Sequence, residues 1–89
     1  MSKTRNRGVR NSLIVVYGRR CMLCERKLKK KKGSITLHHI IPVSEGGETT
    51  FENGGLLCPQ CHTYLHLQNE QEQERLNRRI RSYKRKHSR

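Results

Sequence analysis

Two C-x-x-C pairs constrain this sequence more than any other feature. The first pair is Cys21 and Cys24, the second is Cys58 and Cys61, and residues 25–57 separate them. This spacing is typical of zinc knuckles, in which each tight turn directs two thiolates at one ion and two such turns complete a tetrahedron. The segment between the pairs is longer than in a compact zinc finger, so we expect it to hold structure of its own.

Two other interpretations of the cysteines are paired disulfides and a redox site, and the sequence disfavours both. Paired disulfides need an oxidising compartment, and the apolar run 13–17 is too short for the core of a secretory signal. A thioredoxin-like redox site needs one C-x-x-C at the start of a helix in a longer βαβ fold, for which this chain lacks room. We therefore interpret the four cysteines as ligands of a structural Zn²⁺.

The composition explains why such a chain would need a metal. Only 31% of the 89 residues are hydrophobic, Trp is absent and Phe occurs once. A chain of this size buries a modest share of its surface, and metals, disulfides or partners often supply the missing stability. No apolar run reaches the roughly 18 residues of a membrane span, so we expect a cytoplasmic protein without a membrane partner.

The charge is divided into blocks along the chain. Residues 1–32 carry twelve Lys and Arg against one acid, residues 33–74 carry six acids and no Lys or Arg, and residues 75–89 carry eight basic groups. Dense blocks of like charge repel themselves unless a polyanion neutralises them, so the net charge of +13 indicates a nucleic-acid partner. The alternative is that the two basic segments only keep the chain in solution.

Local patterns predict a small α+β domain, residues 11–68, between a flexible basic arm, 1–10, and a basic C-terminal helix or tail, 69–89. Residues 11–17 fit a short helix or a strand, 35–38 alternate as a half-buried strand does, and 41–55 are mostly loop. A helix is expected over about 58–67, with Pro59 in its first turn. In 69–86 acids come first and bases last, which suits the dipole of a long helix, and Leu76, Ile80 and Tyr83 form its docking stripe.

Four of the five histidines lie in the central block. His62 and His66 are four apart, a spacing that lets two imidazoles on one helix face share a metal ion, whereas the cysteines of the second pair lie on another face. His38 is available as a third ligand, and its neighbour His39 points to the opposite face of a strand unless a kink releases it. Such a site keeps an open coordination position, as catalytic metals do; a second structural zinc is the alternative.

At these residues the sequence resembles the HNH endonuclease family. The match runs from Cys21 to His66 through the segment Leu37–Pro42, the pair Gly46–Gly47, Asn53 and the segment Leu56–His62. The resemblance implies a ββα-metal (His-Me finger) fold, here with a four-cysteine zinc brace, over residues 11–68. Many relatives have Asp in place of His38. The His-His version is similar to the colicin nucleases, which lack the brace, and the small size resembles stand-alone nucleases of phages and prophages, which act in the host cytoplasm.

The resemblance also implies roles for individual residues. His39 is the expected general base, and Asn53 is expected to orient it through its side-chain amide. The three remaining central histidines, His38, His62 and His66, are expected to bind the catalytic ion, which is Mg²⁺, Mn²⁺, Ni²⁺ or Zn²⁺. Because residues 33–74 lack Lys and Arg, we expect the DNA phosphates to be contacted from the basic segments, by Arg19, Arg20, Arg78, Arg79, Arg81, Lys84 and Arg85.

These features predict a metal-dependent HNH endonuclease that hydrolyses phosphodiester bonds in double-stranded DNA. One site per chain cuts one strand, so the expected monomer nicks, and a double-strand break needs a dimer or two events. The alternative from another class is a zinc-dependent nucleic-acid-binding module without catalysis, which does not require the histidines and Asn53. A RING-type interaction module would instead predict a second four-ligand site and no such basic segments.

Overall fold

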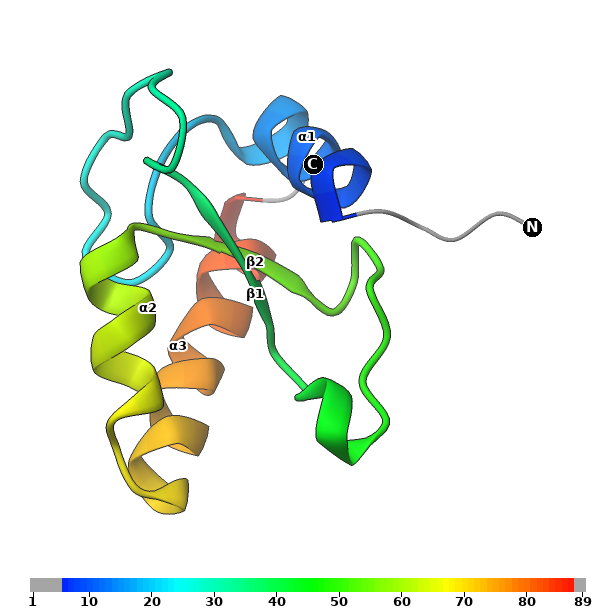
Figure 1. Cartoon of the computed structure of the whole chain (residues 1–89), viewed down its shortest axis with the longest axis vertical. Helices are drawn as coiled ribbons and strands as arrows, with labels where there is room; N and C mark the ends of the chain where they lie inside the picture. The colour runs from blue at the N-terminus through cyan, green and yellow to red at the C-terminus, as the bar shows by residue number, and fades with distance from the viewer. Residues whose placement is uncertain (1–5, 88–89) are drawn as a thin grey trace.

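The fold is built on a two-stranded antiparallel sheet with helices around it (Figure 1), in a computed structural model that describes residues 6–87. Strands β1 (Thr36–His39) and β2 (Gly54–Leu57) pair with His38 opposite Gly55 and His39 opposite Gly54. Helix α1 (Asn6–Tyr17) precedes the sheet, and α2 (Pro59–His66) and α3 (Glu70–His87) follow it. A short 3₁₀ turn, η1 (Val43–Glu45), lies in the loop between the strands. The predicted α+β class is confirmed.

Two glycines let helices approach both faces of β2. A Cβ atom at Gly54 would lie 2.9 Å from a methyl carbon of Leu13 on α1, and one at Gly55 would lie 3.0 Å from a methyl carbon of Ile80 on α3. Since successive residues of a strand face opposite sides, α1 and α3 cover opposite faces of β2. Residues paired across the ladder share a face, so His38 lies on the α3 side and His39 on the α1 side.

The core is small and draws on nearly every element. Its most deeply buried side chains include Leu13, Met22, Leu56, Leu57, Leu65 and Ile80. The predicted stripe of α3 is confirmed, because Leu76, Ile80 and Tyr83 are all buried. Around this centre, Tyr17 of α1 stacks on Phe51 with ring centroids 5.9 Å apart, which ties the first helix to the segment that leads into β2.

The β1–β2 loop makes a tight turn that depends on one glycine. A Cβ atom at Gly47 would lie 1.8 Å from the carbonyl oxygen of Ile41, so no other residue fits without moving the backbone. The Gly47 N–H donates to the carbonyl of Pro42 at 2.9 Å and closes the turn around η1. The segment between the strands is therefore mostly loop, as expected, and the Gly47 turn gives it a defined path.

Two elements differ from the sequence-based expectations. Helix α1 begins at Asn6, so the described part of the expected flexible arm 1–10 is helical, because Val9 and Leu13 lie one turn apart and both are buried; residues 1–5 lie outside the described residues. Strand β2 begins at Gly54, so it includes the last two residues of the predicted loop 41–55. Its two glycines weaken the local strand signal, and its pairing with β1 is a non-local contact.

The other helices match the prediction within a residue or two, since α2 and α3 occupy the segments expected at 58–67 and 69–86. Between Asn6 and His87, no helix is long and apolar enough to cross a membrane.

Candidate active site and zinc site

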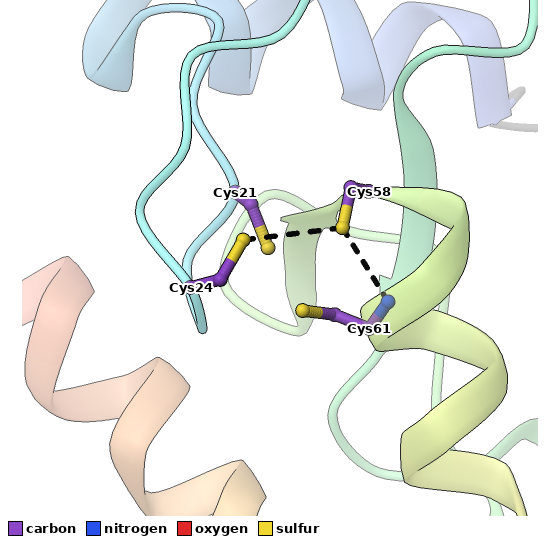
Figure 2. A group of neighbouring side chains, drawn as sticks. All are labelled: Cys21, Cys24, Cys58 and Cys61. Atoms are coloured by element: carbon purple, nitrogen blue, oxygen red, sulfur yellow. Dashed lines mark hydrogen bonds between the residues drawn. The ribbon is translucent and has the colours of Figure 1, made fainter.

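The four cysteines converge on one point (Figure 2). Cys21 and Cys24 lie in a turn after α1, whereas Cys58 and Cys61 lie at the start of α2, and all four sulfur atoms are within 4.8 Å of one another. Four sulfurs held about 2.3 Å from a shared Zn²⁺ are about 3.8 Å apart in a tetrahedron. The separation of 4.0 Å between the sulfurs of Cys24 and Cys58 fits that arrangement.

Local backbone structure aims these thiols. In the first knuckle, Glu25 has a φ of 63°, and the backbone N–H of Cys21 donates to the carbonyl of Arg26 at 3.0 Å, which turns the chain back on itself. In the second, Cys58 is the N-cap of α2, and its sulfur accepts from the backbone N–H of Cys61 at 3.4 Å. Pro59 occupies the first helical turn as predicted.

The chemistry of the sulfurs fits a metal rather than disulfides. All four cysteines are free thiols in the structure, so the disulfide alternative is not what the fold contains. Burial acts to raise the pKa of Cys21, but hydrogen bonds from backbone N–H groups outweigh it and lower that pKa to about 7. Burial raises the pKa of Cys61, and its hydrogen bonds with Cys58 and Cys21 and the negative charge of Cys21 act in the same direction. The four clustered thiols are therefore suited to bind one zinc ion, and we refer to them as the zinc centre.

A second cluster contains three histidines, His38 from β1 and His62 and His66 from α2. One ring nitrogen from each of these residues lies within 4.8 Å of the others. The His62 and His66 rings have centroids 4.8 Å apart, and the His38 ring meets that of His62 nearly at a right angle, with centroids 5.3 Å apart. His38 is buried, His62 is half-buried and His66 is exposed, so the cluster opens to solvent on one side. The predicted ligand set therefore converges, and its donor chemistry suits a divalent ion.

His38 is prepared for such a role. Its Nε2 lies 2.7 Å from Oδ1 of Asn77 on α3, and its Nδ1 is buried without a hydrogen-bond partner among the described residues. Burial, together with the nearby charges of His62 and His66, lowers the pKa of His38 to about 4, although the Asn77 hydrogen bond acts the other way. The imidazole is consequently neutral near pH 7, which is the form that binds metal ions.

His39 lies outside the three-histidine cluster, on the other face of β1. Its Nε2 is 2.9 Å from the hydroxyl oxygen of Thr49 in the β1–β2 loop. His39 is the chain neighbour of His38, and a positive charge on it acts to lower the pKa of His62, after burial and the charge of His66. A half-buried imidazole keeps enough access to solvent for the proton transfers of a general base.

The expected hydrogen bond between the Asn53 amide and His39 is replaced by a different network. Asn53 Oδ1 accepts from the backbone N–H of Ile41 at 2.7 Å, and Nδ2 donates to the carbonyls of Ile41 and Glu48 at 3.0 and 2.9 Å. The amide thus fastens both ends of the β1–β2 loop by satisfying backbone groups that have no partner in a helix or strand. Its route to His39 is indirect, through the loop that carries Thr49.

The prediction that Lys84 contacts DNA is wrong. Its side chain is only 9% exposed, and Nζ donates to the carbonyls of Phe51, Glu52 and Gly54 at 2.7, 3.1 and 2.7 Å. The ammonium also lies 5.2 Å from the centroid of the Phe51 ring. A lysine occupied in this way is a structural cross-link between α3 and β2, and it is not available to a phosphate.

The predicted arginines have varied surroundings. Arg79 donates to the carbonyl of Leu23 at 3.0 Å, Arg20 donates to the carbonyl of Glu25 at 2.8 Å, and Arg78 pairs with Glu74 at 3.7 Å on the surface. Arg81 lines a groove with three glutamates, and Arg85 is exposed near the end of α3. Arg19 lies in a different place, a cleft of about 190 Å³ with no acidic residue in its lining, made by Arg10, Asn11, Ile14, Arg19, Lys30, Lys31, Lys32, Gly33 and Ile35.

Two polar residues beside the histidines were not predicted from the sequence. Thr49 lies two residues after Gly47 in a loop whose path only the fold defines, and no sequence pattern indicates its role. Asn77 carries a weak signal, because it is a poor helix former in the middle of α3, and it lies three and seven positions before the buried residues Ile80 and Lys84. A polar residue on the inward side of a helix needs a buried partner, and here that partner is His38.

Comparisons with known proteins agree with this architecture. A model of the HNH endonuclease family matches residues 21–68, which include both C-x-x-C pairs and all four central histidines. The chain is 46% identical over 46 residues to a protein named Anaredoxin from Nostoc sp. (strain PCC 7120), a match that covers 52% of this chain and 55% of that protein. It is 50% identical over 32 residues to the type IV methyl-directed restriction enzyme EcoKMcrA of Escherichia coli (strain K12), which covers 36% of this chain and 12% of that enzyme.

The chain thus spans about half the length of one relative and a small part of the other, so these matches speak to the shared domain rather than to either whole protein. The domain itself is matched in order, from the first cysteine knuckle through β1, β2 and α2. The converging thiols, the histidine cluster and the match over more than half of its length show that the chain belongs to the HNH endonuclease family.

Proposed function

We propose that the protein is a metal-dependent endonuclease that hydrolyses phosphodiester bonds in double-stranded DNA. The observation that carries the proposal is the three-histidine cluster, which opens to solvent and includes His38, the chain neighbour of His39. A purely structural zinc site does not need an open side or a fourth imidazole nearby. Membership of a nuclease family and the partial match to a restriction enzyme support the same conclusion.

In this proposal His39 takes a proton from the attacking water. With the Thr49 hydroxyl as acceptor, the proton of His39 resides on Nε2, and Nδ1 keeps the lone pair that a general base requires. Asn53 contributes by holding the loop that presents Thr49. His38, His62 and His66 would hold the divalent ion, which supplies Lewis-acid stabilisation of charge on the phosphate and on the leaving oxygen.

The DNA-binding surface proposed here differs in part from the predicted one. The cleft between α1 and the lysine-rich loop 29–32 places Arg10 and Arg19 beside three lysines, and no carboxylate opposes them. The groove beside Arg81, in contrast, contains Glu45, Glu70 and Glu74, which repel phosphate. We therefore assign the main phosphate contacts to the α1 side of the molecule, with the exposed arginines of α3 in a secondary role.

The cleavage chemistry is tested with supercoiled plasmid and the zinc-loaded protein in separate reactions with Mg²⁺, Mn²⁺, Ni²⁺ and Zn²⁺. We expect cutting that His39→Ala slows about 10²–10⁴-fold, as loss of a general base does. His87→Ala is the matched control, because His87 is exposed at the end of α3, and it should cut as fast as the wild type. If wild type and His39→Ala cut equally well, His39 is not the base.

The same experiment separates the proposal from its alternative. A non-catalytic, zinc-dependent DNA-binding module would retard the plasmid on a gel with every metal and leave it supercoiled. A nicking monomer would convert supercoiled DNA to open circles before any linear form appears. The phage or prophage origin stays a prediction, and no contact in the fold bears on it.

A further inference from the structure

Asn77 occupies a position that the family match does not reach. It lies on α3, outside the matched residues 21–68, and its side-chain oxygen is 2.7 Å from Nε2 of the buried His38. The segment 69–89 was expected to serve as a basic helix or tail. Through this contact α3 lines one side of the histidine cluster, in addition to carrying basic residues.

The contact determines where the His38 proton lies. An amide oxygen only accepts hydrogen bonds, so His38 must donate through Nε2, and the proton is then absent from Nδ1. That leaves Nδ1 with a free lone pair at a buried position where no hydrogen-bond partner is found among residues 6–87. The opposite tautomer would bury an N–H group at Nδ1 with no acceptor among the described residues, which is unfavourable.

The geometry points to Asn77 as the positioning residue of the metal site: it accepts from His38 Nε2–H and so fixes Nδ1 as the atom that binds the divalent ion. This inference rests on the proposed function, because it takes the three histidines as the ligand set. Metal-binding histidines commonly donate their other ring N–H to a nearby acceptor, which sets both the tautomer and the ring orientation. Neither of the other two histidines of the cluster has a described acceptor of this kind on α3.

The first test needs zinc at the cysteines but no metal at the histidines, and it does not depend on activity. Nitrogen chemical shifts of the His38 ring, measured in the zinc-loaded protein before any second metal is added, report which nitrogen carries the proton. We expect the Nε2–H form in the wild type and in Asn77→Asp, and a loss of that preference in Asn77→Leu, which has a similar size and no acceptor. A wild-type ring that is protonated on Nδ1 overturns the inference.

The second test is Ni²⁺ binding to the same zinc-loaded proteins, measured by calorimetry. Asn77→Leu should weaken Ni²⁺ binding about 10–100-fold, whereas Asn77→Asp, which keeps an acceptor, should stay within about threefold of wild type. The matched control is Gln73→Leu, one turn earlier on α3, where the side chain donates to the carbonyl of Gln68 and not to a histidine. It should bind Ni²⁺ as the wild type does.

Equal losses in Asn77→Leu and Asn77→Asp, or no loss in either, would overturn the role of Asn77. A wild type that binds no Ni²⁺ would also overturn it, because the inference requires a metal at His38. These results are separable from the nuclease proposal. If the tautomer and the Ni²⁺ affinities follow the expectation while the plasmid stays intact, Asn77 positions a metal ligand in a protein that is not a nuclease.

Discussion

The side chain of Lys84 stabilises the fold and is not available to contact DNA. It follows the buried residue Tyr83 in α3, and its ammonium group meets three carbonyls at the point where the β1–β2 loop becomes β2. Charge-assisted hydrogen bonds of this kind are stronger than neutral ones, and their donor holds the loop and the strand against α3. In the sequence this lysine is indistinguishable from its basic neighbours, which is why it was included among the DNA contacts.

Replacing Lys84 should therefore reduce stability. Lys84→Met keeps much of the aliphatic length but leaves three carbonyls without their donor, and we expect the free energy of unfolding to fall by about 2–4 kcal/mol. Urea unfolding followed by circular dichroism measures the change. Lys86→Met, on the exposed side of the same helix, is the control and should cost less than about 0.5 kcal/mol. Equal stability of the two variants would contradict the internal role of Lys84.

Some residues of the site can be predicted from their spacing along the sequence, and others cannot. The cysteine and histidine clusters follow from short-range rules, since C-x-x-C turns and an i, i+4 pair on a helix converge by local geometry. Asn77 and Thr49 contact histidines 39 and 10 residues away in the chain, and only the tertiary fold brings these pairs together. Asn53 was predicted as a site residue from the family motif, but its hydrogen-bond partners had to come from the structure.

At the scale of elements, helices were easier to predict than strands. The acidic start and basic end of α3 and the proline of α2 are local signals, and both helices occur where those signals lie. The run Ile14–Val16 fits a helix and a strand equally well in the sequence. The segment is helical in the structure because Val9 and Leu13 are buried on one face of α1. β2 has only four residues, two of them glycines, and it exists because β1, α1 and α3 all pack against it.

The lysine-rich loop and α1 together form the proposed phosphate surface, which leads to a prediction at this scale. Replacing Lys30, Lys31 and Lys32 with Gln removes three charges from the cleft, so DNA affinity should fall and the slope of log affinity against log salt should become shallower by up to about 3. Fluorescence anisotropy with a labelled duplex between about 50 and 200 mM salt measures both quantities.

The matched control for this surface uses three basic residues on α3, Arg78, Arg81 and Lys86, replaced with Gln. Both triple variants lose the same net charge, so a difference between them reports on location rather than on total charge. We expect the loop variant to lose more affinity. If the α3 variant loses as much or more, the main phosphate contacts lie on the helix, which carries five of the seven residues that the sequence predicted as DNA contacts.

For the whole molecule, α2 joins the two metal clusters. Its first turn supplies Cys58 and Cys61 to the zinc centre, and the turns that follow supply His62 and His66 to the other cluster. The position of the histidines therefore depends on how the cysteines pin the start of the helix. The zinc centre also connects the knuckle after α1 to α2, so it closes the chain around a core that is small for an independent domain.

This arrangement predicts that the two metals have different consequences when they are removed. Zinc bound by four thiolates contributes about 10–16 kcal/mol in small zinc domains, which is as large as the net stability of a typical fold. Stripping zinc with a strong chelator should abolish the cooperative thermal transition and most of the helical circular dichroism, and added Zn²⁺ should restore both. The double variant His62→Ala/His66→Ala, loaded with zinc, should melt cooperatively within a few degrees of wild type while failing to bind Ni²⁺ or cut DNA. A chelated wild type that still unfolds at its original temperature would show that the apolar core suffices, and the four cysteines would then need another explanation.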